Sequence, residues 1–234
     1  APLVPIAQPM VKWAVEVNRI EDLPRIMRRA AKVALTPPTG PVFISLPGDI
    51  LNMEAAIDLG ESTRVDAAAR PSDASLENLA ARLARAQRPV IIAGHEIVAS
   101  DAFAEAVQLA EMLGAPVYQQ TVNDGAHFPS EHPAFMGSLN RNQSYVRDVL
   151  SSYDLLICLG ADLLRMSVYS AVDPLPADLA VIQIGQRDWE MGKNHAVELA
   201  LRGDVKETVA ALLPILSARG GQDLQDRAKA SLAT

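Results

Sequence analysis

The chain has 234 residues and a net charge of −7 at pH 7, and 49 % of its residues are hydrophobic. This length suits one large domain, or one domain with part of a neighbour, and the acidic balance argues against nucleic-acid binding, which needs a basic stripe. The sequence has no apolar run near the roughly 20 residues that span a bilayer and no signal peptide, so we expect a cytoplasmic protein without a membrane partner.

The first 50 residues predict one helix followed by one strand. Apolar residues recur at helical spacing over 23–34, and Pro24 suits a helix only in its first turn. A buried strand is expected at 42–46. Because one such unit cannot bury both faces of its strand, it should need a sheet outside this chain. The first five residues contain no initiator methionine, and we interpret them as a cut end.

A linker is predicted over 51–74, where small and charged residues follow no sustained period. We therefore expect residues 1–50 to belong to one domain and residues 75–220 to form a second. Residues 221–234 are mostly polar after two glycines, so they should form a frayed tail or a further linker.

From residue 75 onward, amphipathic helices alternate with continuous apolar strands. Helices are predicted at about 75–86, 101–113, 143–151 and 204–216, and strands at 89–93, 117–120, 155–159, 179–184 and 197–201. A long polar loop is expected from residue 123 to about residue 141. This alternation predicts an α/β fold, a doubly wound, Rossmann-like parallel sheet of about six strands with helices on both faces.

Sheets of this kind bind ligands beyond the carboxyl ends of their strands. The segments expected at that edge are 94–96, 123–125, 160–167, 185–188 and 203–204. The first strand ends in a single glycine, Gly94, where a dinucleotide fingerprint needs three. The phosphate-binding loop, zinc-protease and serine-hydrolase motifs are also absent.

The histidines and carboxylates do not predict a reaction. His127 and His132 lie five residues apart in a loop, but no third metal ligand is evident. His95 follows a strand, where catalysis or a local hydrogen bond would both be reasonable. The only cysteine, Cys158, lies in an apolar run, which is typical of core packing and excludes an internal disulfide.

Several segments, taken together and in order, resemble thiamine-diphosphate-dependent enzymes. Residues 12–14 (KWA) and 40–50 (GPVFISLPGDI) are similar to the end of their pyrimidine-binding domain. Similarity to their central domain lies in RPVIIAG at 88–94, LGAPV at 113–117, FPSEHPAFMG at 128–137, DLLICLG at 154–160, EMGKN at 190–194 and GDV at 203–205. The resemblance implies a decarboxylase or carboligase of 2-oxo acids, with acetolactate synthase and benzoylformate decarboxylase as the nearest types.

The resemblance also implies which residues adjoin the active site. Benzoylformate decarboxylases have a catalytic histidine shortly after the strand at 155–159, and this chain has Ser167 there. We therefore expect Ser167 and Asn140 at the mouth of the active site and no catalytic residue within this chain, and the missing histidine argues against benzoylformate decarboxylation itself.

Acetolactate synthases hold FAD in the central domain with glycines, an arginine and acidic residues. Gly137 and Arg165 match that pattern, whereas Gln183 and Gly185 replace the acids. This argues against tight binding of FAD or ADP without excluding it. Any small-molecule site should be lined by Gly94, Gly137, Arg165 and Gln186. The alternative for Arg165 is an ordinary ion pair with Asp162 or Asp188.

The activating glutamate and the magnesium motif of the family have no counterpart in these residues. The resemblance therefore implies that the full-length enzyme, a homodimer or homotetramer, binds thiamine diphosphate and magnesium, and that this chain alone binds neither. Two alternatives stay open: a stand-alone nucleotide-binding regulatory domain, and a non-catalytic scaffold subunit of the same family.

Overall fold

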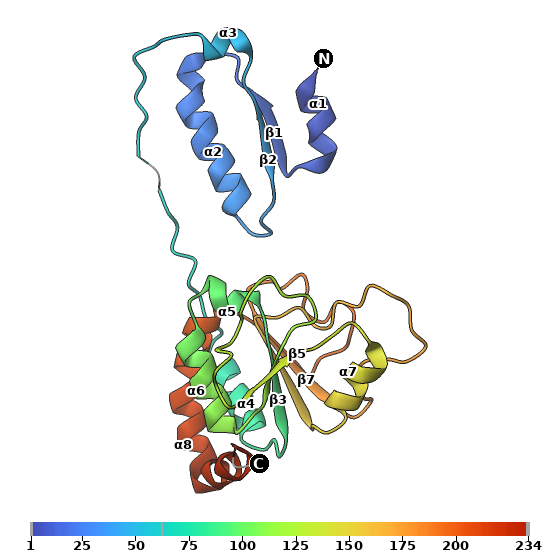
Figure 1. Ribbon diagram of the computed structural model, residues 1–234. Helices are drawn as coiled ribbons and strands as arrows, with labels where there is room; N and C mark the ends of the chain where they lie inside the picture. Colours follow the sequence, from blue (N-terminus) through green and yellow to red (C-terminus); the bar gives the residue numbers. More distant parts are fainter. Residues whose placement is uncertain (1, 62, 233–234) are drawn as a thin grey trace. The chain divides into compact units, whose positions relative to one another are not determined.

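The computed structural model describes residues 2–61 and 63–232, and the chain divides into two units, Ala1–Asp66 and Ala67–Thr234 (Figure 1). Each unit is described by itself. None of the helices in the described ranges is long and apolar enough to cross a membrane.

The N-terminal unit contains a two-stranded parallel sheet. Strand β1 (Trp13–Glu16) pairs with β2 (Val42–Ser45), and helix α2 (Leu23–Leu35) connects them with Pro24 in its first turn, as predicted. The short helices are α1 (Leu3–Ala7), η1 (Gln8–Met10), η2 (Ile20–Asp22) and α3 (Gly48–Leu51). The sequence predicted only the strand that corresponds to β2. It missed β1, a four-residue strand whose residues are not fully buried. Residues 53–61 and 63–72 form no helix or strand.

The second unit is built on six parallel strands in the order β5-β4-β3-β6-β7-β8, which confirms the predicted sheet. The strands are β3 (Pro89–Ala93), β4 (Val117–Gln119), β5 (Phe135–Ser138), β6 (Leu155–Leu159), β7 (Ala180–Gly185) and β8 (Leu199–Arg202). Strand β5 lies within the segment predicted to be a polar loop. It is an edge strand of four residues whose side chains alternate between exposed and half-buried, so it has little of the apolar signal of a core strand.

Both faces of this sheet are covered, which explains why its strands are continuously apolar. Helices α4 (Asp73–Leu83), α6 (Phe103–Leu113) and α8 (Val205–Leu232) cover one face, and α7 (Gln143–Leu150) lies on the other (Figure 1). The short helix α5 (His95–Ala99) follows β3 and had not been predicted. Successive strand residues point to opposite faces, so Ile91 packs in one core and Ile92 in the other. Cys158 is fully buried, as expected, and burial raises the pKa of its thiol.

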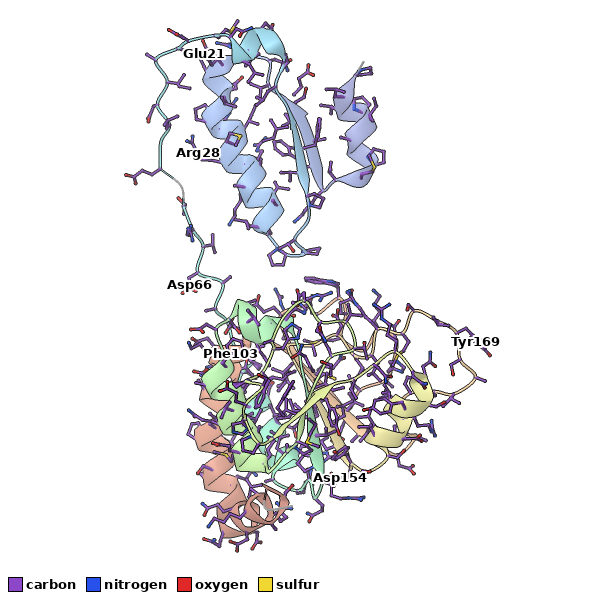
Figure 2. All side chains as sticks on the ribbon, viewed as in Figure 1. Glu21, Arg28, Asp66, Phe103, Asp154 and Tyr169 are labelled. Carbon is purple, nitrogen blue, oxygen red and sulfur yellow. The ribbon has the colours of Figure 1, made fainter. Side chains whose placement is uncertain are left out.

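The central strands β3 and β6 are joined beyond their ladder at both ends. At the amino end, the carboxylate of Asp154 (labelled in Figure 2) accepts hydrogen bonds from the backbone N–H groups of Gln87 at 2.8 Å and Arg88 at 2.9 Å. At the carboxyl end, the backbone N–H of Gly94 donates to the carbonyl oxygen of Leu159 at 3.0 Å. A Cβ atom on Gly94 would lie 2.2 Å from the Cα of Ala161, so only glycine fits at this contact.

The C-terminal tail differs from the prediction of a frayed, polar segment. Helix α8 breaks at Gly221, which has a φ of 55°, and then continues to Leu232. Leu224 and Ala228 lie one helical turn apart and are both buried. The hydroxyl of Ser231 donates to the carbonyl oxygen of Gly114 at 2.7 Å. Two buried apolar residues and a hydrogen bond from Ser231 therefore hold the tail on the unit.

Replacing Leu224 with alanine should test this packing of the tail. The buried side chain is 3 % exposed, so its truncation should lower the free energy of unfolding by about 2–4 kcal/mol. The exposed neighbour Gln225 provides the control, and Gln225→Ala should change the free energy of unfolding by less than about 0.5 kcal/mol. Urea titration followed by circular dichroism measures both, and equal stability of the two variants would contradict the packing.

Replacing Gly94 with alanine should disrupt the contact between the ends of β3 and β6. Forcing an extra atom into a packed contact costs about 1–3 kcal/mol or more. Gly125→Ala is the matched control, because a Cβ at Gly125 would have no atom within 4 Å. The same urea titration should place Gly94→Ala well below both wild type and the control; a midpoint equal to that of Gly125→Ala would refute the close approach.

Candidate functional site

The strand order creates a topological switch point between β3 and β6. From β3 the chain passes to β4 on one side, and from β6 it passes to β7 on the other. Ligands of doubly wound sheets bind in the crevice outside the carboxyl ends of the strands at such a point. The segments 94–96 and 160–162 follow these two strands, so this edge is the candidate site.

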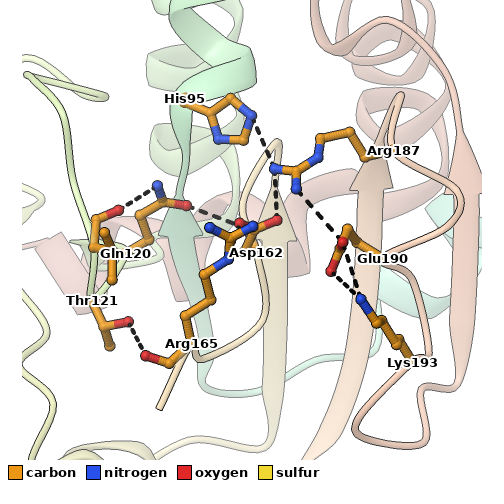
Figure 3. Close-up of polar contacts among 9 residues, drawn as sticks. His95, Gln120, Thr121, Asp162, Arg165, Arg187, Glu190 and Lys193 are labelled. Atoms are coloured by element: carbon orange, nitrogen blue, oxygen red, sulfur yellow. Dashed lines mark hydrogen bonds and ion pairs between the residues drawn. The ribbon is translucent and has the colours of Figure 1, made fainter. Parts of the chain in front are cut away.

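Asp162 is the centre of the polar network at this edge (Figure 3). One carboxylate oxygen, Oδ2, lies 2.7 Å from Nε of Arg165, and the other, Oδ1, lies 2.8 Å from Nη1 of Arg187. The backbone N–H of Asp162 donates to the side-chain oxygen of Gln120 at 3.3 Å. The Asp162 side chain is only 12 % exposed and that of Arg187 23 %, so their ion pair is shielded from water more than surface pairs are, whereas the Arg165 side chain is 55 % exposed.

Arg187, which follows β7, extends the network to α5 at the end of β3. Its Nη1 lies 3.3 Å from Nε2 of His95, and its Nη2 lies 3.8 Å from a carboxylate oxygen of Glu190. Glu190 in turn pairs with Lys193 at 3.3 Å. Burial, and then the charge of Arg187, lower the pKa of His95. The imidazole is therefore held neutral, and its Nε2 accepts the hydrogen bond from the guanidinium.

A second chain of hydrogen bonds joins α5, which follows β3, to the start of α8. A carboxylate oxygen of Glu96 accepts the backbone N–H of Gln186 at 2.5 Å. The side-chain amide of Gln186 donates to Asp204 at 2.9 Å, and Asp204 accepts the backbone N–H of Glu207 at 3.1 Å, as an N-capping residue does. Burial raises the pKa of Glu96.

Three of the four residues predicted to line a ligand site lie at this edge. Arg165 is paired with Asp162, which is one of the two alternatives that the sequence left open. Gln186 is bonded through both its backbone and its side chain, and the backbone of 160–161 packs against Gly94. Gly137 lies in the edge strand β5, two strands away from β3, with a φ of 93° and open space around it.

An open groove of about 930 Å³ adjoins Arg165 on the loop that follows β6. Ser167 lines it, and Nη1 of Arg141 lies 3.4 Å from the Ser167 hydroxyl. Because arginine keeps its proton, it cannot serve as a general base for that hydroxyl. Asn140 is exposed, and its side-chain oxygen accepts the backbone N–H of Asn142 at 2.8 Å, at the start of α7.

The histidines of the 123–135 loop have structural partners. Nε2 of the buried His127 lies 2.8 Å from the carboxylate of Asp124, and this hydrogen bond lowers the pKa of Asp124. His132 lies 3.3 Å from Glu111 and packs edge-on against Phe128. Within the described residues, no three histidine, cysteine, aspartate or glutamate side chains gather to hold a metal ion.

The sequence placed Glu96 and Arg187 in segments expected at this edge but gave them no role, and it did not place Gln120 there. All three come within three residues after a strand of the sheet, and that position was the available signal. Their pairing depends on which strands are neighbours, which the sequence does not state directly.

Comparison with known proteins gives the family. A model of the "Thiamine pyrophosphate enzyme, central domain" matches residues 76–212. Benzoylformate decarboxylase from Pseudomonas aeruginosa is 31 % identical over 89 % of this chain and 40 % of that protein. Acetolactate synthase isozyme 1 large subunit from Escherichia coli is 29 % identical over 92 % of this chain and 38 % of that protein.

Solved structures agree in fold. The crystal structure of benzoylformate decarboxylase from Polynucleobacter necessarius superposes with a TM-score of 0.78 at 27 % identity, and the match covers 92 % of this chain and 40 % of that one. The chain thus spans about two fifths of the length of the relatives it matches. The family match covers every strand of the six-stranded sheet, and the chain therefore belongs to the thiamine pyrophosphate enzyme family, whose central domain it contains.

Proposed function

We propose that this chain is part of a thiamine-diphosphate-dependent enzyme that decarboxylates or joins 2-oxo acids. It would supply the central domain and the end of the pyrimidine-binding domain, with domain boundaries near residues 50, 75 and 220. The observation that carries the proposal is the family match over 76–212, which coincides with the whole sheet. The names of the relatives, a decarboxylase and a synthase, support this reaction class.

The residues of this chain do not fit the anchor of the cofactor. When bound, thiamine diphosphate supplies the electron sink for cleavage next to a carbonyl group. Its diphosphate would need a magnesium site, and the described residues hold no cluster of three metal-binding side chains. We therefore propose that magnesium and the diphosphate are bound by residues outside this chain, in a cytoplasmic homodimer or homotetramer.

The contribution of this chain to the reaction would be to shape the entrance of the active site. Ser167 and Arg141 line the open groove, and Asn140 holds the start of α7 beside it. The hydroxyl of Ser167 can donate to a substrate oxygen or accept from a substrate hydroxyl. The partner that the described residues give it, Arg141, is not a base that would make it a nucleophile. Its role would be to orient the substrate.

A direct test compares this chain with the full-length protein. The 234-residue chain should show no saturable binding of thiamine diphosphate with magnesium in calorimetry. The full-length protein should bind both and release carbon dioxide from a 2-oxo acid such as pyruvate. Micromolar binding by the chain alone would contradict the proposed division of residues. If the full-length protein binds neither thiamine diphosphate nor magnesium, it is instead a scaffold subunit.

Replacing Ser167 with alanine in the full-length enzyme tests the proposed entrance. Loss of one neutral hydrogen bond to the substrate should lower kcat/KM by about 2- to 10-fold. Ser151→Ala is the matched control, because that exposed hydroxyl bonds only to the carbonyl oxygen of Arg147 in α7 among the described residues. An unchanged kcat/KM in Ser167→Ala, as in the control, would remove Ser167 from the active-site entrance.

A further inference from the structure

Both arginines at the switch point, and several of its backbone amides, have partners within the chain. Nucleotide phosphates are held in such folds by backbone amides near a glycine turn and by arginine side chains. Here the two arginines at the edge, Arg165 and Arg187, share one carboxylate. That carboxylate belongs to Asp162.

The geometry of Asp162 is that of a bound anion. Each of its two oxygens faces a different guanidinium group, at 2.7 Å and 2.8 Å. A phosphate group accepts the same kind of charge-assisted hydrogen bonds from arginine as a carboxylate does. Among the described residues Arg165 pairs with no other carboxylate, and Arg187 has only Glu190, at 3.8 Å.

The backbone around this carboxylate leaves no approach for a pyrophosphate. In dinucleotide sites a glycine turn lets the phosphates come close to the chain. At Gly94 that place is taken by the carbonyl oxygen of Gly160 and by Ala161, each of which would lie 2.2 Å from an added Cβ. The backbone amide of Gln186, at the same edge, is also occupied, because it donates to the carboxylate of Glu96.

The space inside the network is too small for a nucleotide, but it lies beside an open groove. The cavities next to Asp162 measure about 20 Å³ and 10 Å³, which is room for one water molecule at most. Arg165 lines both the first of these and the groove of about 930 Å³. An anion bound by Arg165 could therefore extend the rest of its molecule into the groove.

We propose that the carboxylate of Asp162 is a built-in anion that fills a two-arginine phosphate site at the switch point. The wild-type chain then holds no nucleotide at this point. Removal of the Asp162 charge frees both guanidinium groups, and Arg165, which lines the groove, can then bind a phosphate group from the groove side. The Asp162 carboxylate thus gives the expected lack of tight FAD or ADP binding a second physical cause, beyond the replacement of acids at Gln183 and Gly185.

The test is calorimetric titration of the 234-residue chain with ADP and with inorganic phosphate. Asp162→Asn keeps the size of the side chain and removes its charge. Asp188→Asn is the matched control, because Asp188 lies at the same edge, pairs with Arg202 at 3.5 Å and carries the same charge. We expect Asp162→Asn to bind ADP at least about tenfold more tightly than wild type and the control, because two guanidinium groups have lost their anion.

Each outcome of the titration decides the proposal. A rise in the melting temperature of Asp162→Asn with added phosphate, without such a rise in wild type, supports it independently. Equal ADP affinity in wild type and Asp162→Asn overturns it, and so does an equal gain in Asp188→Asn, which would show a general charge effect.

If Asp162→Asn does not fold, the wild-type chain decides together with Arg165→Gln. ADP binding by wild type that Arg165→Gln abolishes would overturn the proposal, because it would show an open site. An absence of ADP binding, or ADP binding that Arg165→Gln leaves unchanged, supports a switch point that is closed from within.

Discussion

The pairing of β3 with β6 is the contact on which the second unit depends, because it joins the two halves of the sheet. Their parallel ladder runs from Pro89 opposite Leu155 to Ala93 opposite Leu159. Asp154 fastens the amino end through two backbone amides. At the carboxyl end the absence of a side chain on Gly94 allows the backbone of 160–161 to pack directly against β3. Helices then cover both faces, so the central strands are buried and apolar throughout.

The same close approach determines what the carboxyl edge can do. It brings Asp162 between two arginines and Glu96 beside the amide of Gln186. Polar groups at a switch point normally remain available to a ligand, whereas here they satisfy one another. Buried charges are stable only when they are paired and hydrogen-bonded, so the network both closes the crevice and ties β3, β6 and β7 together. The open groove beyond Arg165 remains the part of this edge that a small molecule can enter.

Much of the fold followed from the sequence, since continuous apolar runs such as 89–93 and 155–159 are long enough to be recognised as buried strands. Strands β1 and β5 were missed because each has four residues that are not fully buried. The helical tail was missed because Leu224 and Ala228 are its buried apolar residues in an otherwise polar sequence. In the site, Arg165 and Gln186 were identified by their positions after strands. The partners of these residues were not, because Glu96 meets Gln186 across 90 residues of sequence and only the strand order brings them together.

The most direct measurement of the central claim is a crystal structure of the wild-type chain grown in the presence of ADP. The account predicts electron density for the Asp162 carboxylate between Arg165 and Arg187, with no phosphate group at the ends of β3 and β6. Density for a phosphate between the two arginines, with the Asp162 side chain turned away, would contradict it.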